Sequence, residues 1–217
     1  MENTIKKSWR DISINEYYQL KDISDDTEME EYEKEVALIA FLNNMTESEV
    51  WNLDINKFRK LQVEKTWLYE FNFDKSKNFK KIEIKGNKYN VNIDLQKMNV
   101  AQYIDFQTYW PQRDNMRQII GNLLAIFIIP KGHKYNEGYD IDEVISDIKE
   151  NIDIMTAQEI LFFFLSSYQI SIRIMLNYLN WKMKRLKKKS NPKKKEIIEN
   201  IQKEIQNLEK LILDGSI

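Results

Sequence analysis

The sequence predicts a mainly helical α+β protein, with a helical domain around a small central β-hairpin and a C-terminal antiparallel αα-hairpin. Capping motifs precede several apolar runs of helical period. Two short central stretches alternate polar and apolar residues, as half-buried strands do. Gly and Pro number only five and three in 217 residues, which favours long regular elements. We expect two domains, residues 1–155 with the β-hairpin and residues 156–217 with the longest helix and the helical hairpin.

Capping boxes predict where several helices begin. In this motif the first side chain accepts a hydrogen bond from the amide three residues on, and an acidic side chain reaches back. The pattern occurs at Ser13–Glu16, Thr27–Glu30, Thr46–Glu49 and Thr156–Glu159. Asp140 is a related N-cap, and Asn191-Pro192 combines an N-cap with a proline at the first helical position.

The first half of the chain is expected to contain three or more helices before the strands. The helix after Thr27 places apolar or small residues at spacings of three and four, with acids on its other face. These residues are Tyr32, Val36, Ile39, Ala40 and Asn43. A further helix is predicted over about Ile55 to Leu68.

The middle of the chain predicts a β-hairpin. Phe79–Ile84 and Tyr89–Ile93 alternate with period two, and Gly86-Asn87 between them suits the positive φ of a tight turn. Glu70–Phe73 is a candidate third strand. A two-stranded hairpin is marginally stable alone, so we expect it to pack on helices or pair with another chain.

Helices return after the hairpin. Asp114–Ile128 is predicted as an apolar helix that ends at Pro130, and Gly121 inside it indicates a close helix crossing. Asp140–Ile152 is predicted as a short amphipathic helix. The longest helix is expected from Thr156 to about Lys188.

Two segments share a sequence pattern of cap, β-branched residue, any residue, Glu or Gln, and Tyr. They are Ser13–Leu20 and Asn99–Phe106. Each is predicted to start a short helix with its tyrosine on the buried side. The pattern fits either two ordinary capped helices or two related elements that flank the hairpin.

The C-terminal pair of helices carries two heptad seams. The first seam consists of Ile172, Leu176, Leu179, Met183 and Leu186, and the second of Ile198, Ile201, Ile205, Leu208 and Ile212. Ser190-Asn191-Pro192 between them is short and helix-breaking, which predicts an antiparallel hairpin. The seams can close within one chain or between subunits.

Charge is strongly segregated although the formal net charge is only −1. Asp11 to Asp54 contains thirteen acidic and two basic residues, whereas Lys182 to Lys195 contains nine basic residues and no acid. Both runs can be solvated helix faces. Alternatively, they attract copies of the chain to one another, or bind two different partners.

Catalytic and metal-binding motifs are missing from the sequence. The absence of Cys excludes disulfides and thiolate metal sites, and His133 is the only histidine. No Walker loop, dinucleotide fingerprint or nucleophile elbow occurs. Asp140, Asp142 and Glu143 lack the glycine and spacing of a calcium loop. We therefore expect a protein that is not an enzyme and that uses no cofactor or metal.

A membrane span is not expected. Ala157–Trp181 is strongly apolar and precedes a basic cluster, but Glu159, Gln169, Arg173 and Asn177 interrupt it. A span needs roughly 18–20 consecutive apolar residues. We therefore predict a buried helix here and no membrane partner.

Three stretches together resemble proteins of tailed bacteriophages. They are Asn99–Asp105, Ile119–Gly132 and Tyr139–Val144. Their order of a helix, an apolar helix ending in Pro-x-Gly and an acidic amphipathic helix is similar to that of phage tail assembly chaperones. More broadly, these stretches resemble neck and tail structural proteins. The resemblance implies a protein-binding role without active-site residues.

The predicted function is that of a non-catalytic phage virion protein, a ring or connector component of the neck or tail. Its expected partners are other phage structural proteins and further copies of itself, in the virion and, during assembly, in the host cytoplasm. One alternative is a transient tail assembly chaperone that binds through an apolar Ile160–Ile174 face. The other is a nucleic-acid-binding protein. The candidate interaction residues are Lys182, Lys184, Arg185, Lys187, Lys188, Lys189, Lys193, Lys194, Lys195, Ile198, Ile201, Ile205, Leu208 and Ile212.

Overall fold

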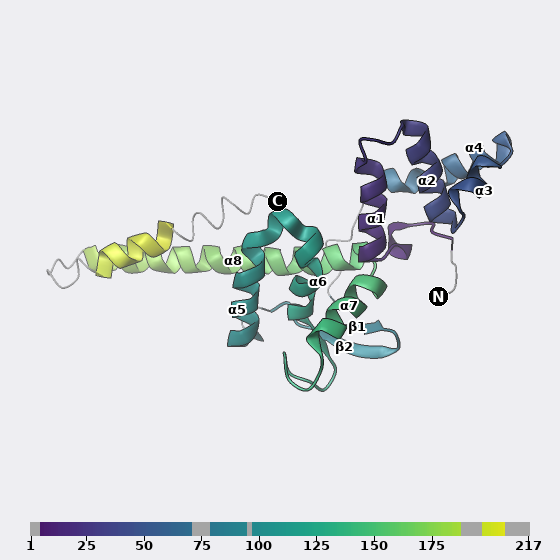
Figure 1. The fold of residues 1–217 in the computed structure, drawn as a ribbon. Coiled ribbons are helices and arrows are strands. Elements are labelled where there is room, and N and C mark those ends of the chain that lie inside the picture. Colours follow the sequence, from purple (N-terminus) through teal and green to yellow (C-terminus); the bar gives the residue numbers. More distant parts are fainter. Residues whose placement is uncertain (1–4, 71–78, 95–96, 188–196, 207–217) are drawn as a thin grey trace. The chain divides into compact units, whose positions relative to one another are not determined.

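The computed structural model describes residues 5–70, 79–94, 97–187 and 197–206, and the chain divides into two compact units. The N-terminal unit covers residues 1–162 and the C-terminal unit residues 163–217. The boundary falls inside the longest helix. Helices dominate and one small antiparallel sheet accompanies them, which confirms the predicted mainly helical α+β class (Figure 1).

The N-terminal unit holds the sheet and most of the helices. Its helices are α1 (Ile14–Asp25), α2 (Glu31–Asn43), α3 (Glu47–Trp51), α4 (Ile55–Glu64), α5 (Val100–Tyr109), α6 (Met116–Phe127), α7 (Ile141–Asn151) and the start of α8 (Ile154–Lys187). Short 3-10 helices cover Trp9–Asp11, Thr66–Tyr69 and Trp110–Asn115. The strands are β1 (Lys81–Ile84), β2 (Asn87–Val91) and β3 (Ile128–Pro130).

Two helix starts confirm the predicted capping boxes. Ser13 accepts a hydrogen bond from the Glu16 amide at 3.2 Å, and Thr46 accepts one from the Glu49 amide at 3.2 Å. Asp140 caps α7, as predicted, by accepting from the amide of Asp142 at 2.9 Å. The Asn191-Pro192 cap lies outside the described residues.

The other two predicted boxes are wrong, because other acidic side chains cap these helices. The Glu30 amide, which the Thr27 box would use, donates instead to the Glu33 carboxylate at 2.9 Å. Asp26 accepts from the amide of Met29, so the chain bends there and α2 begins only after its N-cap Glu30 rather than at Thr27. Asp153 accepts from the Thr156 amide at 2.9 Å, so α8 starts at Ile154. An aspartate side chain is short enough to cap the backbone two or three residues on, which makes it a strong competitor.

The predicted hairpin is part of a three-stranded antiparallel sheet in the order β1-β2-β3. Positive φ angles at Lys85 and Gly86, +50° and +79°, place the turn one residue earlier than the predicted Gly86-Asn87. The third strand, β3, directly follows α6 and pairs Val91 with Ile128. The candidate strand Glu70–Phe73 lies outside the described residues apart from Glu70.

Helix α6 forms the centre of the N-terminal core. It starts at Met116, two residues after the predicted Asp114, and residues Leu123 to Phe127 are all buried. A Cβ atom built on Gly121 would lie 2.6 Å from Lys149 Cε and 3.0 Å from Ile145 Cγ2. This approach of α7 confirms the predicted close helix crossing at Gly121.

The two segments with a shared pattern both begin with capping boxes, as predicted. Tyr17 is half-buried, but Tyr103 is 52% exposed, so the expected burial of its ring is wrong. The buried polar group at this turn is Gln102, whose Nε2 donates a 2.7 Å hydrogen bond to the Ile126 carbonyl. The helix therefore faces α6 through its glutamine rather than its tyrosine.

The start of the chain is fastened to the start of α8 within the N-terminal unit. Ile14 N donates to the Ile152 carbonyl at 3.1 Å, and Ile154 N donates to the Ile12 carbonyl at 2.9 Å. Arg10 forms an ion pair with the fully buried carboxylate of Glu159. These contacts join residues about 140 positions apart in the sequence.

The C-terminal unit contains the rest of α8 and a second helical segment over residues 197–206. Leu179, Ile201 and Ile205 are buried against one another. Leu176, Met183 and Leu186 pack around them. Within the described residues, the heptad seams therefore close inside one chain. The connection Ser190-Asn191-Pro192 and the seam residues Leu208 and Ile212 lie outside the described part.

Candidate interaction surfaces

An apolar stripe runs along α8 on the side opposite the seam. Ile170, Ile174, Tyr178 and Trp181 are 58%, 64%, 54% and 54% exposed, and we call them the α8 outer stripe. Their spacings of four, four and three residues keep them on one helix face. With about 100° of rotation per residue, that face points away from the face that carries Leu179. The expectation that Ala157–Trp181 is buried throughout is therefore wrong for these residues.

Two cations of the predicted basic cluster lie over the aromatic end of the stripe. Lys182 Nζ is 5.9 Å from the ring centroid of Tyr178, and the Arg185 guanidinium is 5.5 Å from that of Trp181. Such cation–π contacts hold positive charge directly beside apolar surface. The stripe thus combines hydrophobic area with a basic end.

Only part of the predicted interaction set can be placed. Lys184 is exposed and Lys187 is the last residue of α8, while Ile198 is half-buried on the second helix. Ile201 and Ile205 lie inside the seam, so they hold the hairpin together rather than face a partner. Lys188, Lys189, Lys193, Lys194 and Lys195 lie outside the described residues.

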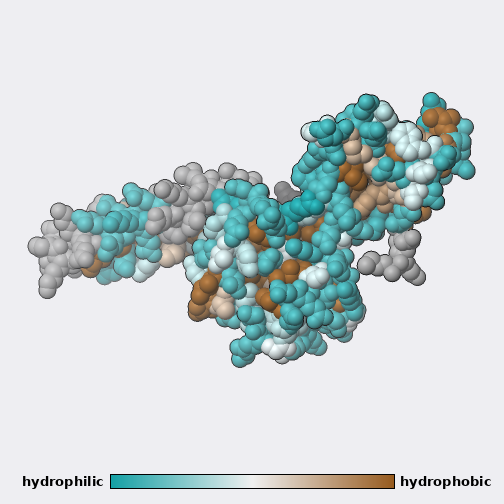
Figure 2. Space-filling model, in the orientation of Figure 1, coloured by the Kyte–Doolittle hydropathy of each residue, from teal (hydrophilic) through white to brown (hydrophobic). Residues whose placement is uncertain are grey.

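The N-terminal unit has an acidic surface that also carries exposed aromatic rings. Tyr32 and Trp51 meet edge to face with centroids 5.9 Å apart, and both are more than half exposed, as is Ile55. The negative charge of Glu30 is the largest cause that raises the pKa of Tyr32. We call Glu30, Glu31, Tyr32, Trp51 and Ile55 the acidic aromatic patch. Figure 2 shows hydrophobic surface in this region, where α3 and α4 meet.

The acidic run is not entirely solvated. Glu35 pairs at 2.8 Å with Lys65, which is itself buried, and Lys6 pairs with Glu16 at 2.8 Å. These ion pairs neutralise part of the acidic excess and link α1 and α2 to segments outside them. Among the described residues, Glu30 has no ion-pair partner, although its carboxylate takes part in the capping box at the start of α2.

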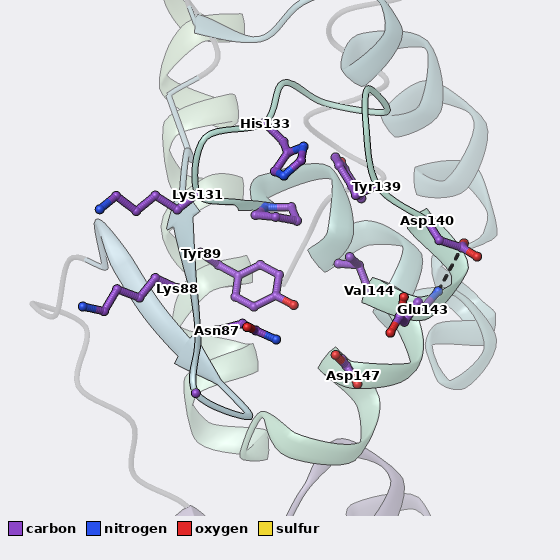
Figure 3. Close-up of a pocket in the computed structure, with 12 residues that line it drawn as sticks. Asn87, Lys88, Tyr89, Lys131, His133, Tyr139, Asp140, Glu143, Val144 and Asp147 are labelled. Atoms are coloured by element: carbon purple, nitrogen blue, oxygen red, sulfur yellow. Dashed lines mark hydrogen bonds between the residues drawn. The ribbon is translucent and has the colours of Figure 1, made fainter.

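A polar groove of about 510 Å³ opens in the N-terminal unit beside the sheet (Figure 3). Tyr89 of β2 and Val144 of α7 lie at its base, and Glu143 of α7 lines one side. His133 occupies a loop, as predicted, and its ring meets Tyr139 edge to face with centroids 5.8 Å apart. Sequence reasoning missed this groove because its residues come from distant segments.

No group of three or more His, Cys, Asp or Glu side chains in the described part of the chain is arranged to hold a metal ion. Asp140 is occupied as the α7 cap, where it accepts from the amides of Asp142 and Glu143. That role agrees with the interpretation of Asp140 as a helix cap rather than a calcium ligand.

Helix α8 has the length and composition of a membrane-crossing helix over Ile154–Leu186. A core helix of a soluble protein can satisfy the same two criteria. Ile154, Ala157 and Ile160 are buried within the N-terminal unit, so the first turns of this stretch belong to a protein core.

Comparison with known proteins gives no relative. No protein-family model matches the chain, and no curated protein or solved structure matches it. The surfaces described above are therefore the basis for a functional proposal.

Proposed function

We propose that this chain is a non-catalytic structural protein of the neck or tail of a tailed bacteriophage. It would be a ring or connector component that stays in the virion and acts through protein–protein interfaces. The resemblance of segments within residues 99–144 to such proteins motivates the phage assignment. The α8 outer stripe is the observation that supports an interface role most strongly.

The α8 outer stripe takes no part in packing the hairpin, because a different face of α8 forms the seam. A helix exposed on one side normally carries polar residues there, and contiguous exposed apolar surface is typical of interaction sites. Here one side of α8 packs on residues 197–206 of the same chain, and the opposite side presents Ile170, Ile174, Tyr178 and Trp181. Two apolar faces on one helix fit packing against two neighbours.

A second copy of the chain offers a complementary surface. The α8 outer stripe ends in Lys182 and Arg185, while the acidic aromatic patch combines Glu30 and Glu31 with Tyr32, Trp51 and Ile55. Opposite charges around aromatic and aliphatic groups favour a head-to-tail contact between copies. Such heterologous contacts close into a ring when the rotation between neighbours allows it.

Charge exchange tests the contact directly. Lys182→Glu/Arg185→Glu in one variant and Glu30→Lys/Glu31→Lys in another should each shift the native mass toward the monomer. Mixing the two variants should restore association, because each supplies a charge that fits the other. Lys203→Glu, on the exposed side of the second helix, is the matched control and should keep the wild-type mass. Monomeric wild-type protein at high concentration would contradict the proposed contact.

Mass spectrometry of purified particles tests the virion assignment separately. A structural component should occur in the phage that encodes it at a fixed copy number. Its absence from particles would favour the transient chaperone instead. For that role the expected Ile160–Ile174 binding face needs correction, because Ile160, Phe164 and Ile172 are buried and only Ile170 and Ile174 are more than half exposed.

Nucleic-acid binding through the basic cluster is the remaining alternative. Lys182 and Arg185 lie over aromatic rings, where single-stranded bases can also stack. Retention on a DNA column that falls with salt, and that Lys182→Glu/Arg185→Glu abolishes, would favour this function. Retention unchanged by that variant would rule out Lys182 and Arg185 as the nucleic-acid site.

A further inference from the structure

The groove beside the sheet has the features of a binding site for a positively charged side chain. We propose that it receives the ammonium group of a lysine or the guanidinium group of an arginine from a partner protein. This inference uses only the N-terminal unit. It therefore does not depend on the head-to-tail contact proposed above.

Tyr89 supplies the first indication of a ligand. Its side chain is only 4% exposed, and Figure 3 shows its hydroxyl pointing into the groove toward α7. Among the described residues, none forms a hydrogen bond with this hydroxyl. The hydroxyl oxygen itself borders the open groove, so water or a ligand that enters the groove can bond to it.

The charge around the hydroxyl selects a cation. Burial raises the pKa of Tyr89, and the negative charges of Asp147 and Glu143 raise it further. Glu143 and Asp147 lie one turn apart on α7, so both carboxylates border the same space (Figure 3). A negatively charged ligand would be repelled here, whereas a cation is attracted.

The lysines of the protein do not neutralise the groove. Lys85 donates to Asp147 at 2.7 Å and also pairs with Glu150 at 3.5 Å, so one cation faces two carboxylates. Glu143 has no ion pair within the described part of the chain. Lys88 and Lys131 contribute to the rim, but their ammonium groups point away from the space in Figure 3. A negative charge therefore remains for a ligand.

The other residues that line the groove favour an amino-acid side chain over a bare metal ion as the ligand. The described residues include no cluster suited to a metal, whereas Tyr89 and Tyr139 place ring surface along the groove. Ring faces attract ammonium and guanidinium groups, and the methylene stem of the same side chain can lie against Val144. A hydrogen-bond donor with a cationic head and an apolar stem fits all of these groups.

Amide-capped amino acids test the proposal by NMR titration of the full chain. N-acetyl-lysine and N-acetyl-arginine methylamides should shift Tyr89 and α7 resonances in a saturable way. The matching citrulline compound, which has a similar shape without the charge, should not. Equal binding of citrulline would overturn the cationic assignment. Saturation by spermidine but by neither amino acid would overturn the assignment to a protein side chain.

Variants of the groove should weaken that binding while the fold is kept. Glu143→Gln is expected to weaken it about tenfold, because a charge-assisted hydrogen bond becomes a neutral one. Tyr89→Phe should weaken it by a smaller factor. Asp142→Asn, on the same helix turn but outside the groove, is the control and should bind like the wild type. Unchanged affinity in Glu143→Gln with a native spectrum would overturn the proposal.

Discussion

The two units of this chain bury their apolar residues in different ways. In the N-terminal unit, α6 is buried along its C-terminal half because α5, α7 and β3 surround it. In the described part of the C-terminal unit, α8 packs on residues 197–206, and its far side presents the outer stripe. The two helices therefore differ in how far their own unit covers them: the C-terminal half of α6 is buried, whereas α8 keeps apolar residues exposed opposite the seam.

A core truncation in the N-terminal unit should lower the free energy of unfolding more than any other change considered below. Leu124 is fully buried in α6, so Leu124→Ala removes apolar contacts and leaves a cavity. We expect the free energy of unfolding to fall by about 3–5 kcal/mol, the range for such changes in well-packed cores. Ile174→Ala on the outer stripe is the matched control, with an expected change within about 0.5 kcal/mol. Chemical denaturation measures both, and similar losses would remove the contrast between the units.

Removal of the Arg10 side chain should give the second-largest loss of stability. Glu159 has no exposed surface, and Arg10→Ala takes away the guanidinium that pairs with it. Loss of an ion-pair partner by a buried charge costs about 3 kcal/mol or more. Arg10→Ala/Glu159→Gln should recover part of the stability, since the buried negative charge is gone. A double variant no more stable than Arg10→Ala would show that the effect comes from packing.

A truncation in the seam should destabilise the C-terminal unit alone. Ile201→Ala weakens the contact with Leu179 that holds residues 197–206 on α8. We expect a loss of about 2 kcal/mol, at the low end of the range because the seam is narrow. Hydrogen exchange should show faster opening of the second helix with unchanged protection in α6. Equal acceleration in α6 would mean that the two units unfold as one.

The smallest effect concerns a surface ion pair. The Arg117 guanidinium donates hydrogen bonds to Asp22, one of them at 2.7 Å, which lowers the pKa of that carboxyl. A depressed pKa means that the contact stabilises the fold above the unfolded-state pKa and is lost as pH falls through the folded-state value. NMR titration should place the Asp22 midpoint below its ordinary value, and Arg117→Ala should return it. An unchanged midpoint in that variant would contradict the contact.

Local hydrogen bonds were the most predictable part of the fold. Ser13, Thr46 and Asp140 cap helices as their sequences indicate, because each bond joins residues two or three positions apart. The prediction at Thr27 failed because Glu30 is the N-cap of α2 and its amide donates to Glu33. The prediction at Thr156 failed because Asp153 caps the backbone three residues earlier. A four-residue motif does not reveal which of two neighbouring caps is used.

Properties that depend on distant segments were less predictable. The strand β3 continues the apolar sequence of α6, so only its pairing with β2 distinguishes it from another helical turn. The heptad seam was visible because its spacing repeats, but the same apolar sequence contains the exposed Ile170 and Ile174. The groove at Tyr89 joins a strand, a loop and a helix, and its pattern appears only after folding.

The bridge between Ser13 and Asp153 has a consequence for the order of events during synthesis. The backbone partners of Ile12 and Ile14, around residues 152–154, leave the ribosome about 140 residues after them. At translation rates of roughly 5–20 residues per second, that delay is on the order of ten seconds. Until then α1 can form its helix, but it lacks its hydrogen-bond partners at residues 152–154. The N-terminal unit therefore completes its core only when nearly all of it has been made.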